Sequence, residues 1–101
     1  MDKKDALNVA HRYAETVKNV FDFQKIILFG SYARGNYRED SDIDIAVIFP
    51  DYNNRLDRQL DLMKLTRKVD TRIEPHPFKE KEFEISNPFV NEIQQTGILI
   101  N

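Results

Sequence analysis

Two carboxylates stand on alternate positions where an apolar run begins. Asp42 and Asp44 occur in the segment Ser41-Asp42-Ile43-Asp44-Ile45. In an extended strand, residues two apart lie on one face about 6.5 Å from each other, so the two side chains can converge on one site. Like charges repel, and hard oxygen ligands hold Mg²⁺ or Mn²⁺ rather than zinc. The pair therefore predicts a cation site. The alternative is that the two aspartates are ordinary charged residues at the solvent-exposed start of a strand.

A third carboxylate from a neighbouring strand would complete a two-metal site. Neighbouring strands lie about 4.8 Å apart, and the ions of such sites lie about 3.5–4 Å apart. The candidates are Glu74, between Ile73 and Pro75, and Asp70, at the exit of the preceding predicted helix. Their strand parity is the same and does not choose between them. Glu74 is favoured by the expected register, because Asp70 can serve turn chemistry instead.

A glycine-bounded loop precedes the two aspartates. Gly30 and Gly35 permit backbone angles that turn amides toward an anion. Ser31 supplies a hydroxyl and Arg34 a cation, which completes the ingredients of a phosphate cradle. Most glycine loops only make turns, but a phosphate held here would neighbour a cation held by the aspartates.

The surrounding sequence predicts helices and strands that position this loop. Apolar residues at helical spacing, with Asp2 as a cap, predict a helix over residues 2–21, and similar spacing predicts another from the turn at 51–54 to about 68. A third helix is expected from Asn87-Pro88 through residue 95. Strands are expected over 25–29, 43–49 and 71–74, with a further short strand in the tail 97–100 and room for a helical turn after Ser31.

The expected third strand is followed by two prolines. We expect Pro75 and Pro77 to halt that strand and His76, between them, to be a loop residue. The order of elements then predicts the α+β class, with a small mixed β-sheet and helices packed on it. A chain of 101 residues predicts a single domain over 1–101.

The amino-acid composition excludes several classes of protein and of binding site. The chain is 41% hydrophobic and 32% charged, with a formal net charge of -2, so we expect a folded protein without strong nucleic-acid binding. It has no cysteine, which excludes disulfides and Cys-based zinc sites. The first residues are charged and no stretch reaches membrane-spanning length, so a cytoplasmic protein without membrane association is expected.

The loop and the aspartates together resemble a known signature. Residues 30–35, GSYARG, followed after five residues by SDID at 41–44, resemble the G-S-x-A-R-G…S-D-x-D pattern of the DNA polymerase β-like nucleotidyltransferase superfamily, and most closely its minimal nucleotidyltransferase branch, the antitoxin type. The resemblance extends over most of the chain. It implies the nucleotidyltransferase fold, two Mg²⁺ ions (or Mn²⁺), and transfer of a nucleoside monophosphate with release of pyrophosphate.

The same resemblance implies roles for individual residues. Asp42 and Asp44, with a third acid, would bind the metals, and Gly30 and Ser31 would grip the nucleoside triphosphate. Arg34 would contact a phosphate or brace the loop. The family commonly has Asp as its third carboxylate, so Glu74 or Asp70 in that place is a departure.

The implied function has two forms. In the first, the protein is an enzyme that moves AMP from ATP to a hydroxyl acceptor, expected on a partner such as a small helical HEPN toxin. In the alternative, it is a non-catalytic antitoxin that neutralises such a partner by contact. Nucleic-acid polymerisation is a weaker third reading, because larger relatives use extra domains to hold a primer and 101 residues leave no room for one.

Overall fold

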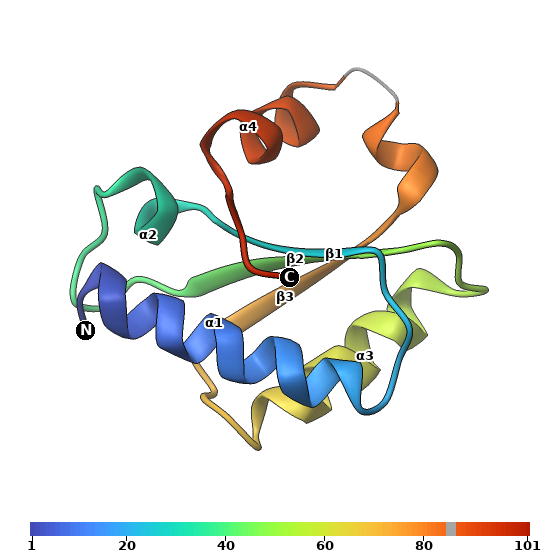
Figure 1. Cartoon of the computed structure of the whole chain (residues 1–101), viewed down its shortest axis with the longest axis horizontal. Coiled ribbons are helices and arrows are strands. Elements are labelled where there is room, and N and C mark those ends of the chain that lie inside the picture. Colours follow the sequence, from blue (N-terminus) through green and yellow to red (C-terminus); the bar gives the residue numbers. More distant parts are fainter. Residues whose placement is uncertain (85–86) are drawn as a thin grey trace.

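A four-stranded mixed sheet forms the centre of the protein, as predicted, and helices cover both of its faces (Figure 1). The computed structural model describes residues 1–84 and 87–101. The elements in chain order are α1 (Lys3–Lys18), β1 (Lys25–Phe29), α2 (Ser31–Arg34), β2 (Ile43–Phe49), α3 (Arg55–Thr66), β3 (Ile73–Lys79), the 3₁₀ turn η1 (Glu80–Phe83), α4 (Pro88–Thr96) and β4 (Ile98–Leu99).

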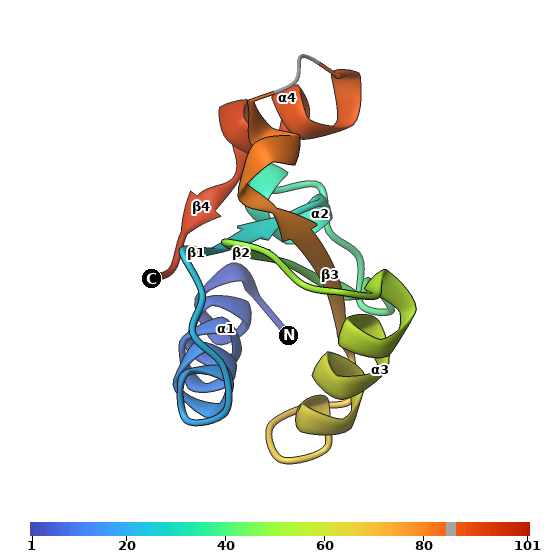
Figure 2. The ribbon, with the colours of Figure 1, turned by 90° about the vertical axis from the view of Figure 1, so that its right-hand side faces the viewer.

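The strands are arranged in the order β3-β2-β1-β4. Strand β1 pairs antiparallel with both β2 and β4, whereas β2 pairs parallel with β3. A parallel pair needs a crossover connection, and α3 supplies it. The short strand expected in the tail is β4, and the helical turn expected after the first glycine is α2. Figure 2 shows α1 and α3 on one side of the sheet and α4 on the other.

Strand β2 alternates between two apolar clusters. Its odd-numbered residues from Ile43 to Phe49 are buried in the cluster shared with α1 and α3. Its even-numbered members Ala46 and Ile48 are buried against Phe78 and the α4 side chains on the opposite face. Asp44 has the same parity as Ala46, so its side chain belongs to the α4 face of the sheet.

The longer helices begin where the sequence predicted, each after a residue whose side chain caps it. The side chains of Asp2, Asn54 and Asn87 each accept a hydrogen bond from a backbone amide two or three residues further on. Helix α1 ends at Lys18, so its expected extension to Phe21 is wrong. Phe21 instead lies in the following turn and packs edge to face on a core aromatic ring of β2, which explains why it fits the apolar spacing. Helix α3 also ends two residues before its expected limit, in a turn.

Strand β3 continues through both prolines to Lys79, so the prediction that they halt it is wrong. The carbonyl of Arg72 accepts a hydrogen bond from the amide of Ile43 in β2. The backbone N–H and C=O groups of the even-numbered residues of β3 therefore point toward β2, and those of the odd-numbered residues point toward the free edge of the sheet. Prolines 75 and 77 therefore interrupt no ladder bond. Their carbonyls meet side chains instead: Pro75 accepts from Gln59 at 2.7 Å, and Pro77 lies 3.5 Å from the Tyr52 hydroxyl.

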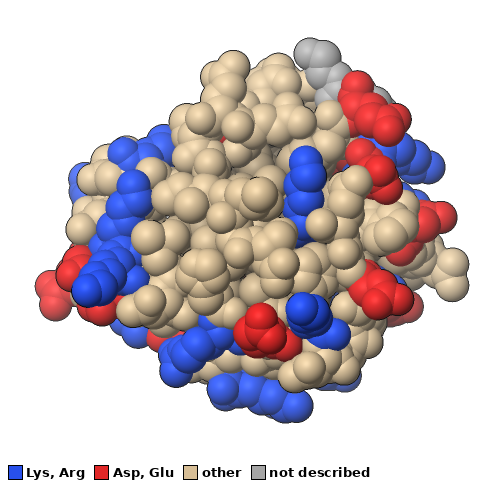
Figure 3. Space-filling model, in the orientation of Figure 1, with Lys and Arg blue, Asp and Glu red and all other residues tan. Residues whose placement is uncertain are grey.

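The surface mixes the two signs of charge. On the face shown in Figure 3, basic and acidic side chains are mixed along the lower edge, and the centre is mostly uncharged apart from a basic side chain right of the middle. On α3 three large apolar side chains are exposed at helical spacing: Leu56 at 66%, Leu60 at 47% and Met63 at 49%. Within residues 1–84 and 87–101, no helix has the length and apolar character needed to cross a membrane.

Candidate metal centre and phosphate loop

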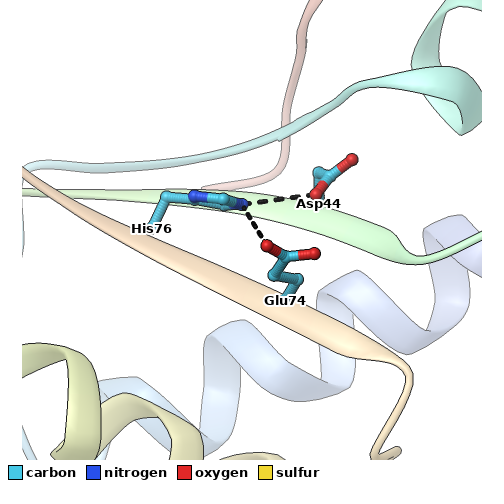
Figure 4. Close-up of side chains that lie close together, drawn as sticks. All are labelled: Asp44, Glu74 and His76. Atoms are coloured by element: carbon cyan, nitrogen blue, oxygen red, sulfur yellow. Dashed lines mark hydrogen bonds and ion pairs between the residues drawn. The ribbon is translucent and has the colours of Figure 1, made fainter.

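Two adjacent strands bring a carboxylate pair together. In the parallel register, Asp44 of β2 is the partner of Glu74 of β3, so both side chains lie on the α4 face of the sheet. His76, two residues along β3, joins them (Figure 4). Its Nε2 lies 3.3 Å from Asp44 Oδ1 and 3.8 Å from Glu74 Oε1, and one ligand atom from each residue lies within 4.8 Å of the others. We call these three residues the carboxylate–histidine cluster.

His76 is the functional candidate that sequence reasoning misassigned. It was expected in a loop, but β3 extends past it, and its side chain is only 25% exposed. The ring packs edge to face on Phe29, with centroids 5.1 Å apart, which fixes its orientation. The available signal was the alternation of Glu74 and His76, which places them on one face if the prolines are on an edge strand.

Asp42 lies just before β2 and is exposed. It is not a member of the carboxylate–histidine cluster, although its negative charge raises the pKa of Glu74. Burial raises the pKa of the Glu74 carboxyl, and the charges of Asp44 and Asp42 raise it further, while His76 opposes the shift. Three carboxylates thus crowd one end of the β2–β3 pair, which is an arrangement that a cation would relieve.

Asp70, the other candidate for the third carboxylate, is paired with Arg72. Its Oδ2 accepts from Arg72 Nη2 at 2.6 Å, and its Oδ1 accepts from the Arg72 amide and Nε. The hydrogen bond from the Arg72 side chain holds the pKa of Asp70 below its usual value. Asp70 therefore serves the turn before β3, while Glu74 stands next to Asp44.

Gly30 brings the loop backbone directly against Asp44. Its φ of 75° and ψ of -155° lie in a region that essentially only glycine adopts. A Cβ at this position would overlap Oδ2 of Asp44. Ser31 follows as the first residue of α2, and the first amides of this helix donate to no capping side chain, because the cap position is Gly30. The predicted phosphate loop and the predicted cation site are therefore in contact.

Arg34 ties the loop to α4 near the C-terminus. Its Nη1 donates to Oε1 of Glu92 on α4 at 2.8 Å, and both side chains are partly exposed. Of the two roles implied for Arg34, this contact corresponds to bracing the loop. A phosphate that approached the guanidinium would compete with Glu92 for it.

The donors of the site fit a divalent cation. Carboxylate oxygens from Asp44 and Glu74 are hard ligands suited to Mg²⁺ or Mn²⁺, and the His76 nitrogen faces the same space. Because Gly30 has no side chain, the loop backbone packs directly against the Asp44 side chain. A cation held by Asp44 and Glu74 would therefore lie beside a phosphate held by the loop.

Comparison with known proteins identifies the family. The family described as "Nucleotidyltransferase domain" matches residues 12–99. A relative of this chain is "Putative protein adenylyltransferase MJ0141" of Methanocaldococcus jannaschii. The two sequences are 32% identical over 77 residues, which cover 73% of this chain and 75% of the relative. "Putative protein adenylyltransferase MJ1305" of the same organism is 39% identical over 68% of this chain and 46% of its own length.

Solved structures share the fold. The crystal structure of "a putative nucleotidyltransferase from Sulfolobus solfataricus" superposes with a TM-score of 0.69 at 26% identity, covering 96% of this chain and 80% of that one. A toxin–antitoxin structure with AMP-PNP gives a TM-score of 0.67 at 22% identity, over 90% and 72% of the two chains. At that identity the second likeness shows a common fold.

Proposed function

The chain belongs to the nucleotidyltransferase domain family, and on that premise we propose that it transfers AMP from ATP to a hydroxyl group of a partner protein. The observation that carries the proposal is the contact between Gly30 and Asp44, with Glu74 beside them, because it joins a phosphate loop to a cation site. The names of the Methanocaldococcus jannaschii relatives support protein adenylylation in particular.

We assign the binding roles as follows. Asp44 and Glu74 would hold the divalent cations from adjacent strands, and Asp42, whose charge raises the pKa of Glu74, would complete the acidic set. Gly30 lets the triphosphate approach the carboxylates without a side chain in between, and the Ser31 hydroxyl donates to a phosphate oxygen. When bound, Mg²⁺ or Mn²⁺ would neutralise charge on the triphosphate and on the departing pyrophosphate.

The reaction joins the acceptor to the α-phosphorus. The acceptor oxygen forms a bond to that phosphorus, and the bond from the α-phosphorus to the oxygen that bridges it to the β-phosphate breaks. Pyrophosphate leaves, and the hydroxyl proton passes to solvent. The loop orients the triphosphate while the carboxylates fix the charge around it, so the protein contributes positioning and electrostatics rather than a covalent intermediate.

The proposed partner is a small helical protein of the HEPN type, with a tyrosine as acceptor. The support is the antitoxin-type signature in the loop and motif strand, together with the fold shared with toxin–antitoxin structures. We also propose that the protein and this partner act together in the cytoplasm.

The test combines the purified chain, Mg²⁺ and each nucleoside triphosphate with the protein encoded beside it. Intact mass spectrometry is expected to show a gain of one AMP on the partner with ATP alone. Asp44→Asn should abolish the gain. Asp61→Asn, an exposed aspartate on α3, is the matched control and should retain it. A full gain in the presence of EDTA would contradict the metal-dependent proposal.

The second candidate function is binding without catalysis. The exposed row of Leu56, Leu60 and Met63 on α3 favours it, because apolar side chains on one helix face are typical of a protein-binding surface. A stable complex with the neighbouring protein, formed equally by Asp44→Asn and lacking any mass gain with ATP, would support this candidate over the enzyme.

A further inference from the structure

We propose that His76 is itself a metal ligand and that it gives this site a preference for Mn²⁺ over Mg²⁺. The proposal deepens the proposed function, because it concerns the selectivity of the same site and rests on that site holding a divalent cation. Its starting point is the convergence of three donor atoms of the carboxylate–histidine cluster within 4.8 Å of one another.

The spacing of the donors agrees with a shared ion. Two ligands at right angles around an ion, each bonded at about 2.1 Å, are about 3.0 Å apart. His76 Nε2 lies 3.3 Å from Asp44 Oδ1 and 3.8 Å from Glu74 Oε1. Shifts of about 0.3 Å for the Asp44 contact and about 0.8 Å for the Glu74 contact would bring these atoms to that spacing. Each side chain has at least one rotatable bond to supply such a shift.

The surroundings of His76 keep its Nε2 directed at the carboxylates. The backbone on both sides is fixed by Pro75 and Pro77 within a paired strand. The ring packs on Phe29, which in turn packs on Phe89 of α4 at 5.8 Å. A solvated loop histidine would have no such support, so the strand and the aromatic contacts together present a preoriented nitrogen donor.

A nitrogen donor changes which cation the site prefers. Mg²⁺ binds mainly oxygen, demands near-octahedral geometry and keeps much of its water. Mn²⁺ is the first member of the first-row series, along which the affinity for sites with nitrogen donors rises toward Cu²⁺. A site formed by carboxylates alone would suit both ions. With His76 added, the same carboxylates favour the ion that tolerates mixed oxygen and nitrogen ligands.

The experiment measures Mn²⁺ binding directly. The untagged full chain is titrated with Mn²⁺ alone in a buffer without nitrogen ligands. Electron paramagnetic resonance gives the affinity, and pulsed measurements report coupling to ¹⁴N. We expect nitrogen coupling in the wild-type spectrum. His76→Gln, which offers an oxygen near the same place, should abolish the coupling and weaken Mn²⁺ binding at least about tenfold, while Mg²⁺, measured by competition, binds nearly as before.

The controls separate this inference from the proposed function. His11→Gln, an exposed histidine on α1, should leave the coupling unchanged. Mn²⁺ that binds in an Asp44-dependent way without nitrogen coupling would overturn the role of His76 and leave the proposed function standing. Failure to bind Mn²⁺ at millimolar concentration would also overturn the inference, and the proposed function fails separately if AMP transfer survives EDTA. If His76→Gln does not fold, the wild-type spectrum alone decides.

Discussion

Substituting Gly30 with alanine tests whether the phosphate loop and the carboxylates form one unit. The change affects the protein in two ways. It places a Cβ in a backbone conformation that alanine rarely adopts, and it directs that Cβ at Oδ2 of Asp44. Both effects should appear in the free energy of unfolding, and the second should also displace the Asp44 carboxylate.

The magnitude can be worked out from Gly30 and a matched glycine. Gly35 also has a positive φ, 88°, but its ψ of 4° is left-handed helical and a Cβ there would meet no atom within 4 Å. Gly35→Ala should therefore cost about 1–2 kcal/mol. Gly30→Ala carries about 1–3 kcal/mol of backbone strain and about 1–3 kcal/mol of overpacking. The expected total near 4 kcal/mol is a large part of a small domain's stability.

Urea unfolding of four variants measures the backbone strain and the overpacking. They are Gly35→Ala, Gly30→Ala, Asp44→Ala and the double variant with alanine at 30 and 44. Asp44→Ala removes the two side-chain atoms nearest to the added Cβ and leaves the Asp44 Cβ at 3.2 Å. The overpacking term should then fall, so the double variant is expected to be about 1–2 kcal/mol more stable than additivity predicts.

Two results would refute the reasoning. Equal losses of stability in Gly30→Ala and Gly35→Ala would mean that the contact with Asp44 costs nothing. Strict additivity in the double variant would mean that the loss arises from backbone strain alone. In either case the loop could not be said to sit against the cation site, and the proposal that both act on one triphosphate would lose its structural basis.

Three further predictions concern the carboxylates. Asp44→Asn should lower metal-dependent transfer at least about 100-fold without lowering the melting temperature of the metal-free protein, because it removes a crowded negative charge. The pKa of Glu74 is raised in the folded state, so its ionisation opposes folding; Glu74→Gln should melt at the same or a higher temperature at pH 7, and the difference should vanish below about pH 4. The pKa of Asp70 is lowered by Arg72, so Asp70→Asn should cost about 0.5–1 kcal/mol at pH 7 and progressively less as the pH falls below about 3.9, with transfer retained.

Local sequence determined most of the elements and the core of the motif. The alternation from Ile43 to Phe49 predicted a strand. Asp2, the turn at 51–54 and Asn87-Pro88 marked the starts of helices, because caps and side-chain periodicity depend only on nearby residues. The spacing between the glycine loop and Asp44 is likewise local. The signature was therefore visible in the sequence alone.

Tertiary structure decided which carboxylate joins Asp44 and whether His76 joins them. Glu74 and Asp70 have the same parity, and only the β2–β3 register puts Glu74 next to Asp44. Pro75 is a strand breaker in isolation, but at the free edge of a sheet its missing amide costs no ladder bond, so β3 continues and carries His76 into the site. Register and edge position arise from pairing between distant segments, and for that reason no reading of residues 70–79 alone could have supplied them.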